Sequence, residues 1–355
     1  MAATESVPTS FRQHLLAGQV IPAHPLALTP TRDIDERHQR ALTRYYLDAG
    51  AGGVAVGVHT TGFPIHDETI GLYRPVLALA AETIDESLGA APRPFVRVAG
   101  VIGETRQAVR EATIARELRY DCALLSLGAW RDADDAAILA HCRAVGEVLP
   151  VFGFYLQPAV GGRRLERRFW REFAELPSLV AIKIAPFDRY ATLDVVRAVA
   201  DAGRDDIALY TGNDDAIVAD LLSDVPCVVG GRVVTRRIVG GLLGQWAVWT
   251  RTAVAWLDRI RAWRAEGSSQ VPAEWLRDGM ALTQANAAIF DAANGFAGCL
   301  PGILEVLRRQ GLVRGTWTLD AHERLSEGQA DAISTVLREF PELTDDAAHR
   351  DRWLA

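Results

Sequence analysis

The stretch that decides the fold is LVAIKIAP, residues 179–186. Its short apolar run, rich in β-branched residues and ended by a proline, predicts a buried β-strand. Because side chains alternate across a strand, Ala181, Lys183 and Ala185 share one face, and the bulky Val and Ile residues share the other. The bulky face suits the helix-covered side of a sheet. We therefore expect Lys183 to point into the interior, between two small alanines.

Lys183 is also unusual in composition. The 38 basic residues comprise 37 arginines and this single lysine. A guanidinium does not lose its proton in proteins, whereas a lysine amine can, so arginine replaces lysine as a cation but not as a neutral amine. The retained lysine therefore indicates a chemical role. The alternative is that it only neutralises a buried carboxylate.

Similar apolar runs alternate with amphipathic stretches along the chain, which is typical of a parallel sheet with crossover helices. The predicted strands are 20–28, 53–59, 95–102, 123–127, 151–156, 179–184, 207–211 and 227–229, and predicted helices include 35–49, 105–119, 134–149 and 192–202. Thr105 and Asp134 are expected to cap two of these helices. Eight such units predict a (β/α)8 TIM barrel. An open doubly wound sheet is the alternative, although no GxGxxG follows the first strand.

The C-terminal part of the sequence has a helical pattern throughout, over 238–264, 274–293, 303–310 and 322–340. This pattern predicts a helical extension after the barrel. We expect residues 1–18 to be a lead-in, residues 19–265 the barrel and residues 266–355 the extension.

Composition restricts the classes of partner. The chain has 355 residues, a net charge of −7 and 49% hydrophobic residues. An acidic chain is not suited to bind nucleic acid or an anionic membrane. The first twenty residues show no signal-peptide pattern, and the four cysteines show neither a disulfide framework nor a zinc motif. We expect a cytoplasmic protein with reduced cysteines.

Two further strands predict the surroundings of Lys183. In 151–157 the alternation places Gly153, Tyr155 and Gln157 on the inner face, and the second strand ends in Thr60 and Thr61. Active sites of such barrels lie at the carboxyl ends of the strands. A buried amine loses its proton readily and can attack the ketone of a 2-oxo acid, while a tyrosine transfers protons. Two hydroxyls and nearby backbone N–H groups suit a carboxylate. These residues together predict class I aldolase chemistry.

The other interpretations of these residues are structural. Tyr155 alone is typical of a core residue whose hydroxyl finds a partner, and a Thr-Thr-Gly can end any strand. His59 is expected to enter the barrel, but no HxH or HxxxH pair occurs in the sequence, so we expect no metal site.

With these residues in place, the chain resembles the dihydrodipicolinate synthase and N-acetylneuraminate lyase superfamily over most of its length. The matching segments are GAGG (50–53), TTG (60–62), GFYLQP (153–158), AIK (181–183), TGND (211–214) and GG (230–231). The resemblance implies a barrel with a C-terminal helical extension, a homo-oligomer (tetramer or dimer), and no metal or organic cofactor. It implies that Lys183 forms the Schiff base and Tyr155 transfers protons. It also implies that Thr60 and Thr61 bind the carboxylate, and that Gly212 and Asn213 line the pocket.

Three departures from the family pattern argue against lysine biosynthesis. Phe63 follows the Thr-Thr-Gly where a glutamate is common, SLGAW (126–130) lacks the tyrosine of the fourth strand, and arginine occurs only at the shifted positions 163 and 164. The sequence thus predicts a lyase that joins Lys183 to pyruvate or another 2-oxo acid, with aldol-type cleavage or addition. A dehydratase of 2-oxo-3-deoxy sugar acids, a non-catalytic 2-oxo-acid-binding barrel and a metal-dependent barrel lyase are the alternatives.

Overall fold

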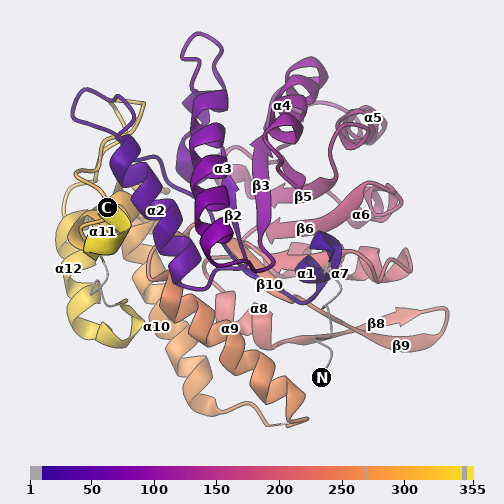
Figure 1. The fold of residues 1–355 in the computed structure, drawn as a ribbon. Coiled ribbons are helices and arrows are strands. Elements are labelled where there is room, and N and C mark those ends of the chain that lie inside the picture. Colours follow the sequence, from indigo (N-terminus) through magenta and orange to yellow (C-terminus); the bar gives the residue numbers. More distant parts are fainter. Residues whose placement is uncertain (1–9, 269, 346–349) are drawn as a thin grey trace, which may run out of the picture.

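The computed structural model describes residues 10–268, 270–345 and 350–355, and eight of its strands form a parallel barrel (Figure 1). In sheet order these strands are β1 (Val20–Pro22), β10 (Gly240–Leu243), β7 (Ala208–Thr211), β6 (Leu179–Ala185), β5 (Val151–Leu156), β4 (Cys122–Leu125), β3 (Val96–Val101) and β2 (Gly53–Val56). A parallel bridge of Ala23 with Ala55 joins β1 to β2. The predicted TIM barrel is confirmed, and the alternative of an open doubly wound sheet is wrong.

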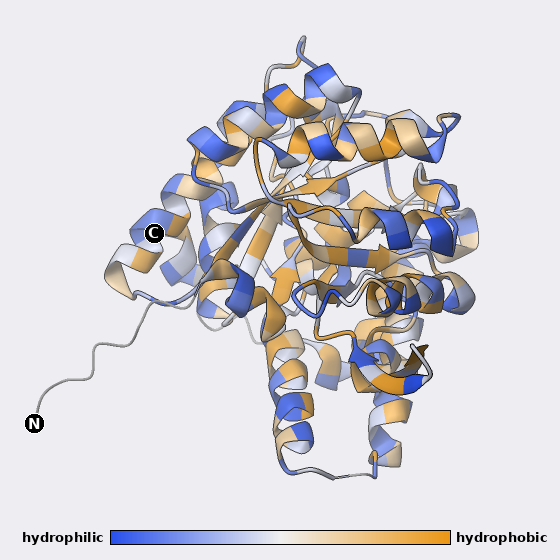
Figure 2. Cartoon of the chain, turned by 90° about the vertical axis from the view of Figure 1, so that its right-hand side faces the viewer, coloured by the Kyte–Doolittle hydropathy of each residue, from blue (hydrophilic) through white to orange (hydrophobic). Residues whose placement is uncertain are grey.

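Amphipathic helices cover the outside of the barrel (Figure 2). They are α2 (Glu36–Asp48), α3 (Tyr73–Ala90), α4 (Thr105–Glu117), α5 (Asp135–Gly146), α6 (Arg167–Phe173), α7 (Arg189–Asp201), α8 (Ile217–Leu222) and α9 (Thr250–Ala265). Asp134 caps α5 as predicted, since its carboxylate accepts the Ala137 N–H at 2.8 Å. The predicted Thr105 cap is wrong, because Thr105 is the first residue of α4 and Glu104 stands at the N-cap without a side-chain hydrogen bond. None of the helices in these described ranges has both the length and the apolar character that a bilayer span requires.

The eighth barrel strand is not where the sequence pattern predicted it. Residues 227–229 belong to β8 (Asp224–Val229), which pairs antiparallel with β9 (Arg232–Arg237) in a hairpin that extends from the barrel (Figure 1). Gly230 and Gly231 form its turn, with φ of 55° and 78°, a geometry that glycine adopts without strain. β10 takes the eighth position in the barrel, although it lies within the stretch that was predicted to be helical. Its two glycines fit there because a side chain on Gly240 would collide with Tyr210 and one on Gly241 would collide with Trp246.

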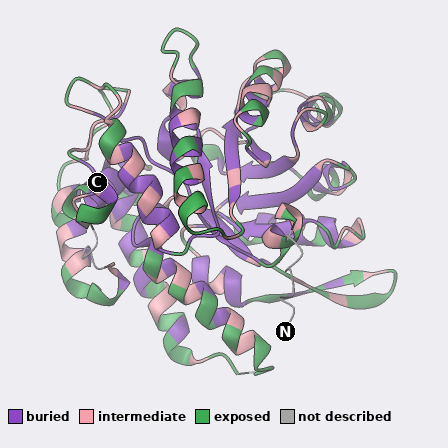
Figure 3. Ribbon diagram, viewed as in Figure 1, coloured by how far each residue is buried: buried purple, intermediate pink, exposed green. Residues whose placement is uncertain are grey.

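All eight barrel strands contribute side chains to the interior, and its two phenylalanines come from β5. Phe152 and Phe154 point inward and pack with small residues of the neighbouring strand, Ala181 and Ala185. A bulge at the start of the β5–β6 ladder also turns Val180 into this interior group. The barrel strands are almost entirely buried, whereas the β8–β9 hairpin and the outer faces of the helices are exposed (Figure 3). The alanines therefore leave space that the two phenylalanine rings occupy.

The C-terminal helices share a hydrophobic core with the barrel helices. They are α10 (Ala273–Ile289), α11 (Cys299–Arg309), α12 (Gln329–Glu339) and α13 (Arg350–Leu354). Ile289, Ile303 and Ile333 are fully buried in the same cluster as the outer face of the barrel strands. At the other end of the barrel, α1 (Phe11–Leu16) places Leu15 in the interior group. The division at residues 18 and 265 stays a prediction.

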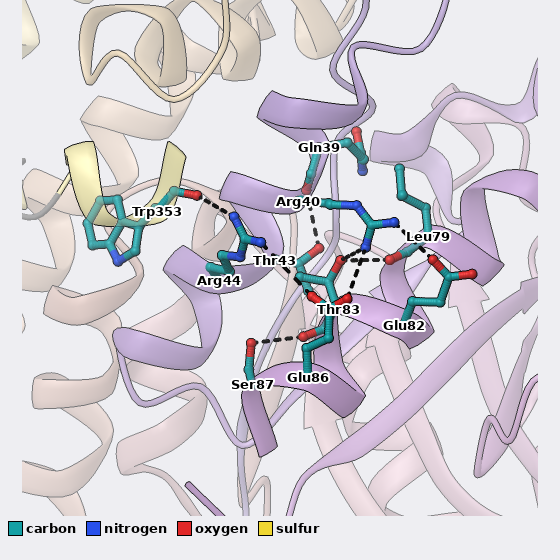
Figure 4. A network of polar contacts seen from close by, with 10 residues as sticks. All are labelled: Gln39, Arg40, Thr43, Arg44, Leu79, Glu82, Thr83, Glu86, Ser87 and Trp353. Atoms are coloured by element: carbon teal, nitrogen blue, oxygen red, sulfur yellow. Dashed lines mark hydrogen bonds and ion pairs between the residues drawn. The ribbon is translucent and has the colours of Figure 1, made fainter. Parts of the chain in front are cut away.

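A polar network on the outside links α2 to α3 and to α13 (Figure 4). The Arg40 guanidinium donates to the Thr83 hydroxyl at 3.0 Å and to the Glu82 carboxylate at 2.9 Å. Arg44 donates to the Trp353 carbonyl at 3.0 Å. Exposed ion pairs contribute little stability, so this network mainly fixes the position of the last helix.

Candidate active site

A cavity of about 70 Å³ lies at the carboxyl ends of the barrel strands and is covered by α10, α11 and the loop between them. Its lining comprises Ala23, Val58, His59, Thr60, Phe154, Leu156, Gln157, Val160, Lys183, Ala185, Phe187, Gly212, Asp214, Gly244, Phe290, Phe296, Cys299 and Ile303. A single buried water needs about 10–15 Å³ of such volume, so this cavity is several times larger than one water site. The position is the one at which (β/α)8 enzymes bind their substrates.

Lys183 lies in this cavity and is 8% exposed. Its Nζ atom is 4.5 Å from the centroid of the Phe154 ring, which belongs to the residue paired with it on β5. Burial lowers the pKa of the amine to about 8, although the nearby Asp214 carboxylate acts in the opposite direction. The inward position of Lys183 agrees with the alternation predicted for β6. With a pKa of about 8 instead of the ordinary 10.5, far more of the amine is neutral near pH 7 than in an exposed lysine.

Asp214 lines the same cavity and was not among the residues assigned from the sequence. Burial raises the pKa of its carboxyl group to about 7, while the Lys183 ammonium lowers it. The Oδ1 atom accepts the Gln245 N–H at 3.1 Å, and the Asp214 carbonyl accepts from the Asn286 amide at 2.7 Å. The charge of each group thus shifts the pKa of the other, so the Lys183 amine and the Asp214 carboxyl group exchange protons in dependence on each other. Both a proton donor and a proton acceptor are available in the cavity wall.

Gly212 allows the lysine to lie where it does. A Cβ atom at this position would be 2.6 Å from Lys183 Cε and 2.7 Å from Ala185 Cβ, well inside van der Waals contact. The expectation that Gly212 lines the pocket agrees with its place in the cavity wall. Its function there is to leave space for the lysine side chain.

Asn213, in contrast, does not line the cavity. Its amide donates to Asp220 Oδ2 at 3.0 Å and to the Thr192 hydroxyl at 3.1 Å, and its Oδ1 accepts the Phe187 N–H at 3.0 Å. The expected pocket position of Asn213 is therefore wrong. The chain leaves the strand geometry after β7, so the side chain turns toward α7 and α8 and holds the loop that follows β6.

The two threonines after β2 differ in their surroundings. Thr60 lines the cavity, and its hydroxyl donates to the Ala23 carbonyl at 2.7 Å. The Thr61 hydroxyl donates to the His24 carbonyl at 2.7 Å and accepts two backbone N–H groups, from Gly57 and Val58. One donor and two acceptor sites are all that a hydroxyl has, so Thr61 has no capacity left for a carboxylate. The expected paired-hydroxyl site is therefore reduced to Thr60.

Tyr155 points away from the cavity, so its expected inward orientation is wrong. Its ring packs on Trp170 of α6 at 5.0 Å, and its hydroxyl donates to the Leu165 carbonyl at 3.2 Å. The inner face of β5 is taken by Phe152 and Phe154 instead. Gly153 faces α6 because a Cβ there would be 2.5 Å from the Phe173 ring. On β5 the large phenylalanines therefore face the barrel interior and the small glycine faces α6. The expectation that bulky residues face the helices does not hold for this strand.

His59 lines the cavity as expected from the alternation of β2. Burial and, to a smaller extent, the Lys183 charge together lower the pKa of its imidazole to about 4, so the ring is neutral at pH 7. In the described ranges no three His, Cys, Asp or Glu side chains come together as a metal site. His59 can therefore act as a neutral hydrogen-bonding group beside Lys183.

No protein-family model matches the sequence, and no curated protein matches it either. Solved structures match it over most of its length. YagE from E. coli K12, a prophage protein of the dihydrodipicolinic acid synthase family in complex with pyruvate, has a TM-score of 0.71 at 18% identity, with 91% of this chain and 98% of that chain covered. Dihydrodipicolinate synthase from Oceanobacillus iheyensis has a TM-score of 0.70 at 18% identity, with 94% and 100% covered.

CdNal from Clostridium difficile, in complex with mannosamine, has a TM-score of 0.70 at 15% identity, and the match covers 91% of this chain and 99% of that chain. Similarity at these identities concerns the arrangement of strands and helices, because one fold carries many activities. The chain therefore has the fold of the solved dihydrodipicolinate synthase structures.

Proposed function

We propose that this chain is a divergent member of the dihydrodipicolinate synthase and N-acetylneuraminate lyase superfamily. In this proposal it is a class I lyase that forms a Schiff base between Lys183 and pyruvate or another 2-oxo acid, and it cleaves or forms a carbon–carbon bond. The observation that carries the proposal is the position of Lys183, a buried amine of lowered pKa in a cavity at the carboxyl ends of the barrel strands. A structural neighbour in complex with pyruvate supports the choice of substrate.

Schiff-base formation needs a neutral amine and a proton donor. The Lys183 amine attacks the ketone carbon, the attacking nitrogen releases one proton, and the carbonyl oxygen takes up a proton to give a neutral carbinolamine. The carbon–oxygen bond then breaks, and the oxygen leaves as water after it takes a second proton. We assign these proton transfers to Asp214, which lines the cavity and whose pKa of about 7 lets both protonation states occur. Tyr155 has no part in this step because it lies on the other face of β5.

The iminium is the electron sink for the second step. The Asp214 carboxylate takes the proton from the hydroxyl on C4, the bond between C3 and C4 breaks, and its electron pair moves into the iminium to give an enamine and an aldehyde. A proton then returns to C3, and water releases pyruvate from the amine. Addition is the same sequence in reverse. The C-terminal helices contribute to the cavity wall, and a site shielded from bulk water in this way would protect the enamine and strengthen each electrostatic contact.

A turnover assay tests this function. Pyruvate release from 4-hydroxy-2-oxo acids is followed with a coupled lactate dehydrogenase, for the wild-type chain and for Lys183→Arg. We expect turnover by the wild-type chain and none by Lys183→Arg, because a guanidinium stays protonated. Release of water instead of an aldehyde from 3-deoxy sugar acids would identify the dehydratase. A chain that binds pyruvate but turns over neither substrate would be the binding barrel.

A further inference from the structure

The part of the cavity beyond Lys183 is apolar on two sides. Leu156, Val160 and Phe187 contribute one wall from the barrel, and Phe290, Phe296 and Ile303 contribute the other from the C-terminal helices. Among the residues that the structure describes, Lys183 and Asp214 are the only cavity-lining side chains with a charge at neutral pH. Burial raises the pKa of the Cys299 thiol, so this group is uncharged as well.

Arginine is absent from this lining although the chain contains 37 arginines. Arg163, which follows β5 closely, donates to the Trp130 carbonyl at 2.6 Å and to the Ala133 carbonyl at 2.8 Å. Its guanidinium is thus used to fix the loop after β4. Within the described ranges, the cavity lining offers no arginine fork for a second carboxylate or a phosphate of a substrate.

Two of the aromatic residues have a strained backbone. Phe187 has φ of 53° and Phe296 has φ of 70°, in the left-handed region that bulky residues rarely adopt. The edge of one ring packs against the face of the other, with centroids 6.0 Å apart and planes at 69°. Strain of this kind persists where the surrounding structure enforces it, and it is concentrated at ligand sites.

Hydrogen bonds hold both strained residues. The Phe187 N–H donates to Asn213 Oδ1 at 3.0 Å, and Asn213 is itself fixed by Asp220. The Phe296 N–H donates to the Asp291 carbonyl at 3.0 Å, and the Asp291 carboxylate accepts the Gly298 N–H at 3.0 Å. Phe187 is therefore positioned by the Asn213 side chain, and Phe296 by the Asp291 main chain in a loop that the Asp291 carboxylate holds, before any ligand binds.

We propose that the substrate carries an uncharged, apolar arm, an aryl or branched alkyl group, which packs against the wall that Phe187 and Phe296 form together while its 2-oxo acid end reacts with Lys183. The inference rests on the proposed function for the reacting end. It goes further by assigning the chemical class of the remainder. In a cleavage reaction this arm leaves as an apolar aldehyde.

The same walls discriminate against polar arms. A hydroxylated arm in this region would lose its bonds to water and find few partners, and an anionic arm would approach the Asp214 carboxylate without a compensating arginine. Preformed aromatic walls instead provide dispersion contacts and remove apolar surface from water.

Isothermal titration with 4-phenylbutanoate and butanoate tests the apolar arm without a ketone, because these two acids differ only by the phenyl group. We expect 4-phenylbutanoate to bind at least about tenfold more tightly, since even one methylene in an apolar pocket is worth roughly that factor. Phe296→Gly should remove this advantage, and glycine accepts the left-handed conformation, so the variant should fold. Tyr190→Ala, which deletes the aromatic side chain of a residue that is 82% exposed in the first turn of α7, is the matched control and should keep the advantage.

Equal binding of the two acids by the wild-type chain, or an advantage that survives in a folded Phe296→Gly, would overturn the apolar arm. Borohydride trapping with pyruvate tests the proposed function independently of the apolar arm. An adduct at Lys183 without a phenyl advantage would refute the arm alone. A phenyl advantage without an adduct would refute the Schiff base and leave an apolar binding site.

Discussion

Gly212→Ala perturbs the lysine without touching its chemistry. The new Cβ would be 2.6 Å from Lys183 Cε, 3.0 Å from Lys183 Cγ and 2.7 Å from Ala185 Cβ. Carbon atoms in contact are about 3.5–4.0 Å apart, so the deficit is roughly 1 Å. Ala185 is fixed to the β6 backbone and cannot move aside. The lysine side chain must therefore shift by a distance of that order.

The size of the effect follows from this displacement. A reacting group misplaced by about 1 Å can cost on the order of 10² in rate, and overpacking of a filled interior costs about 1–3 kcal/mol of the free energy of unfolding. We expect Gly212→Ala to form the reduced pyruvate adduct about a hundredfold more slowly. We also expect a loss of stability within that range, because φ at this position lies outside the glycine-only region and adds no strain.

The assay is the rate of adduct formation with pyruvate and borohydride, read by intact mass, together with urea unfolding. Gly89→Ala is the matched control. It makes the same change in α3, where a Cβ would meet nothing within 4 Å, so it should gain about 0.5–1 kcal/mol and keep the wild-type adduct rate. A Gly212→Ala variant with the wild-type adduct rate would refute the claim that the amine reacts from this position.

Three further substitutions separate the site from its surroundings. Asp214→Asn should slow pyruvate release by about 10²–10⁴-fold in the coupled assay, because an amide transfers no proton. It should also move the midpoint of adduct formation against pH below the wild-type value of about 8, since the carboxylate that raises the pKa of Lys183 is gone; an unchanged midpoint would speak against this coupling. Tyr155→Phe should leave turnover unchanged and cost about 1 kcal/mol in urea unfolding through the lost bond to Leu165, whereas a large loss of turnover at full stability would restore the proton-transfer role. Thr61→Val should destabilise the chain by about 1–3 kcal/mol because it leaves buried N–H groups unpaired, and a variant of wild-type stability would contradict this.

The sequence predicted the barrel and the inward lysine because both depend on local pattern. On β6 the small and bulky residues alternate, and Lys183 lies between two alanines. Alternation alone could not decide which face of β5 points inward. That choice depends on how much space the alanines of β6 leave inside and how much the aromatic rings of α6 take outside. These quantities belong to neighbouring elements, so Tyr155 was placed on the wrong side.

The eighth strand and Asp214 were missed for different reasons. Two valine-rich runs joined by Gly230 and Gly231 form a hairpin signal that length and turn chemistry could have revealed. Asp214 lies within the TGND segment that matched the superfamily, but strand alternation ends after β7. Its side chain is placed by the bond to the Gln245 N–H, which comes from a segment 31 residues away. Such a long-range contact leaves no local mark in the sequence.

The central claim is that a neutral Lys183 amine bonds covalently to the carbonyl carbon of a 2-oxo acid. Incubation with pyruvate and borohydride, followed by intact mass and peptide mapping, tests it most directly because the chain contains no other lysine. If Lys183 forms the Schiff base, we expect one reduced pyruvate per chain, located at residue 183 and absent from Lys183→Arg. An unmodified wild-type chain, or an adduct that persists in Lys183→Arg, would contradict it.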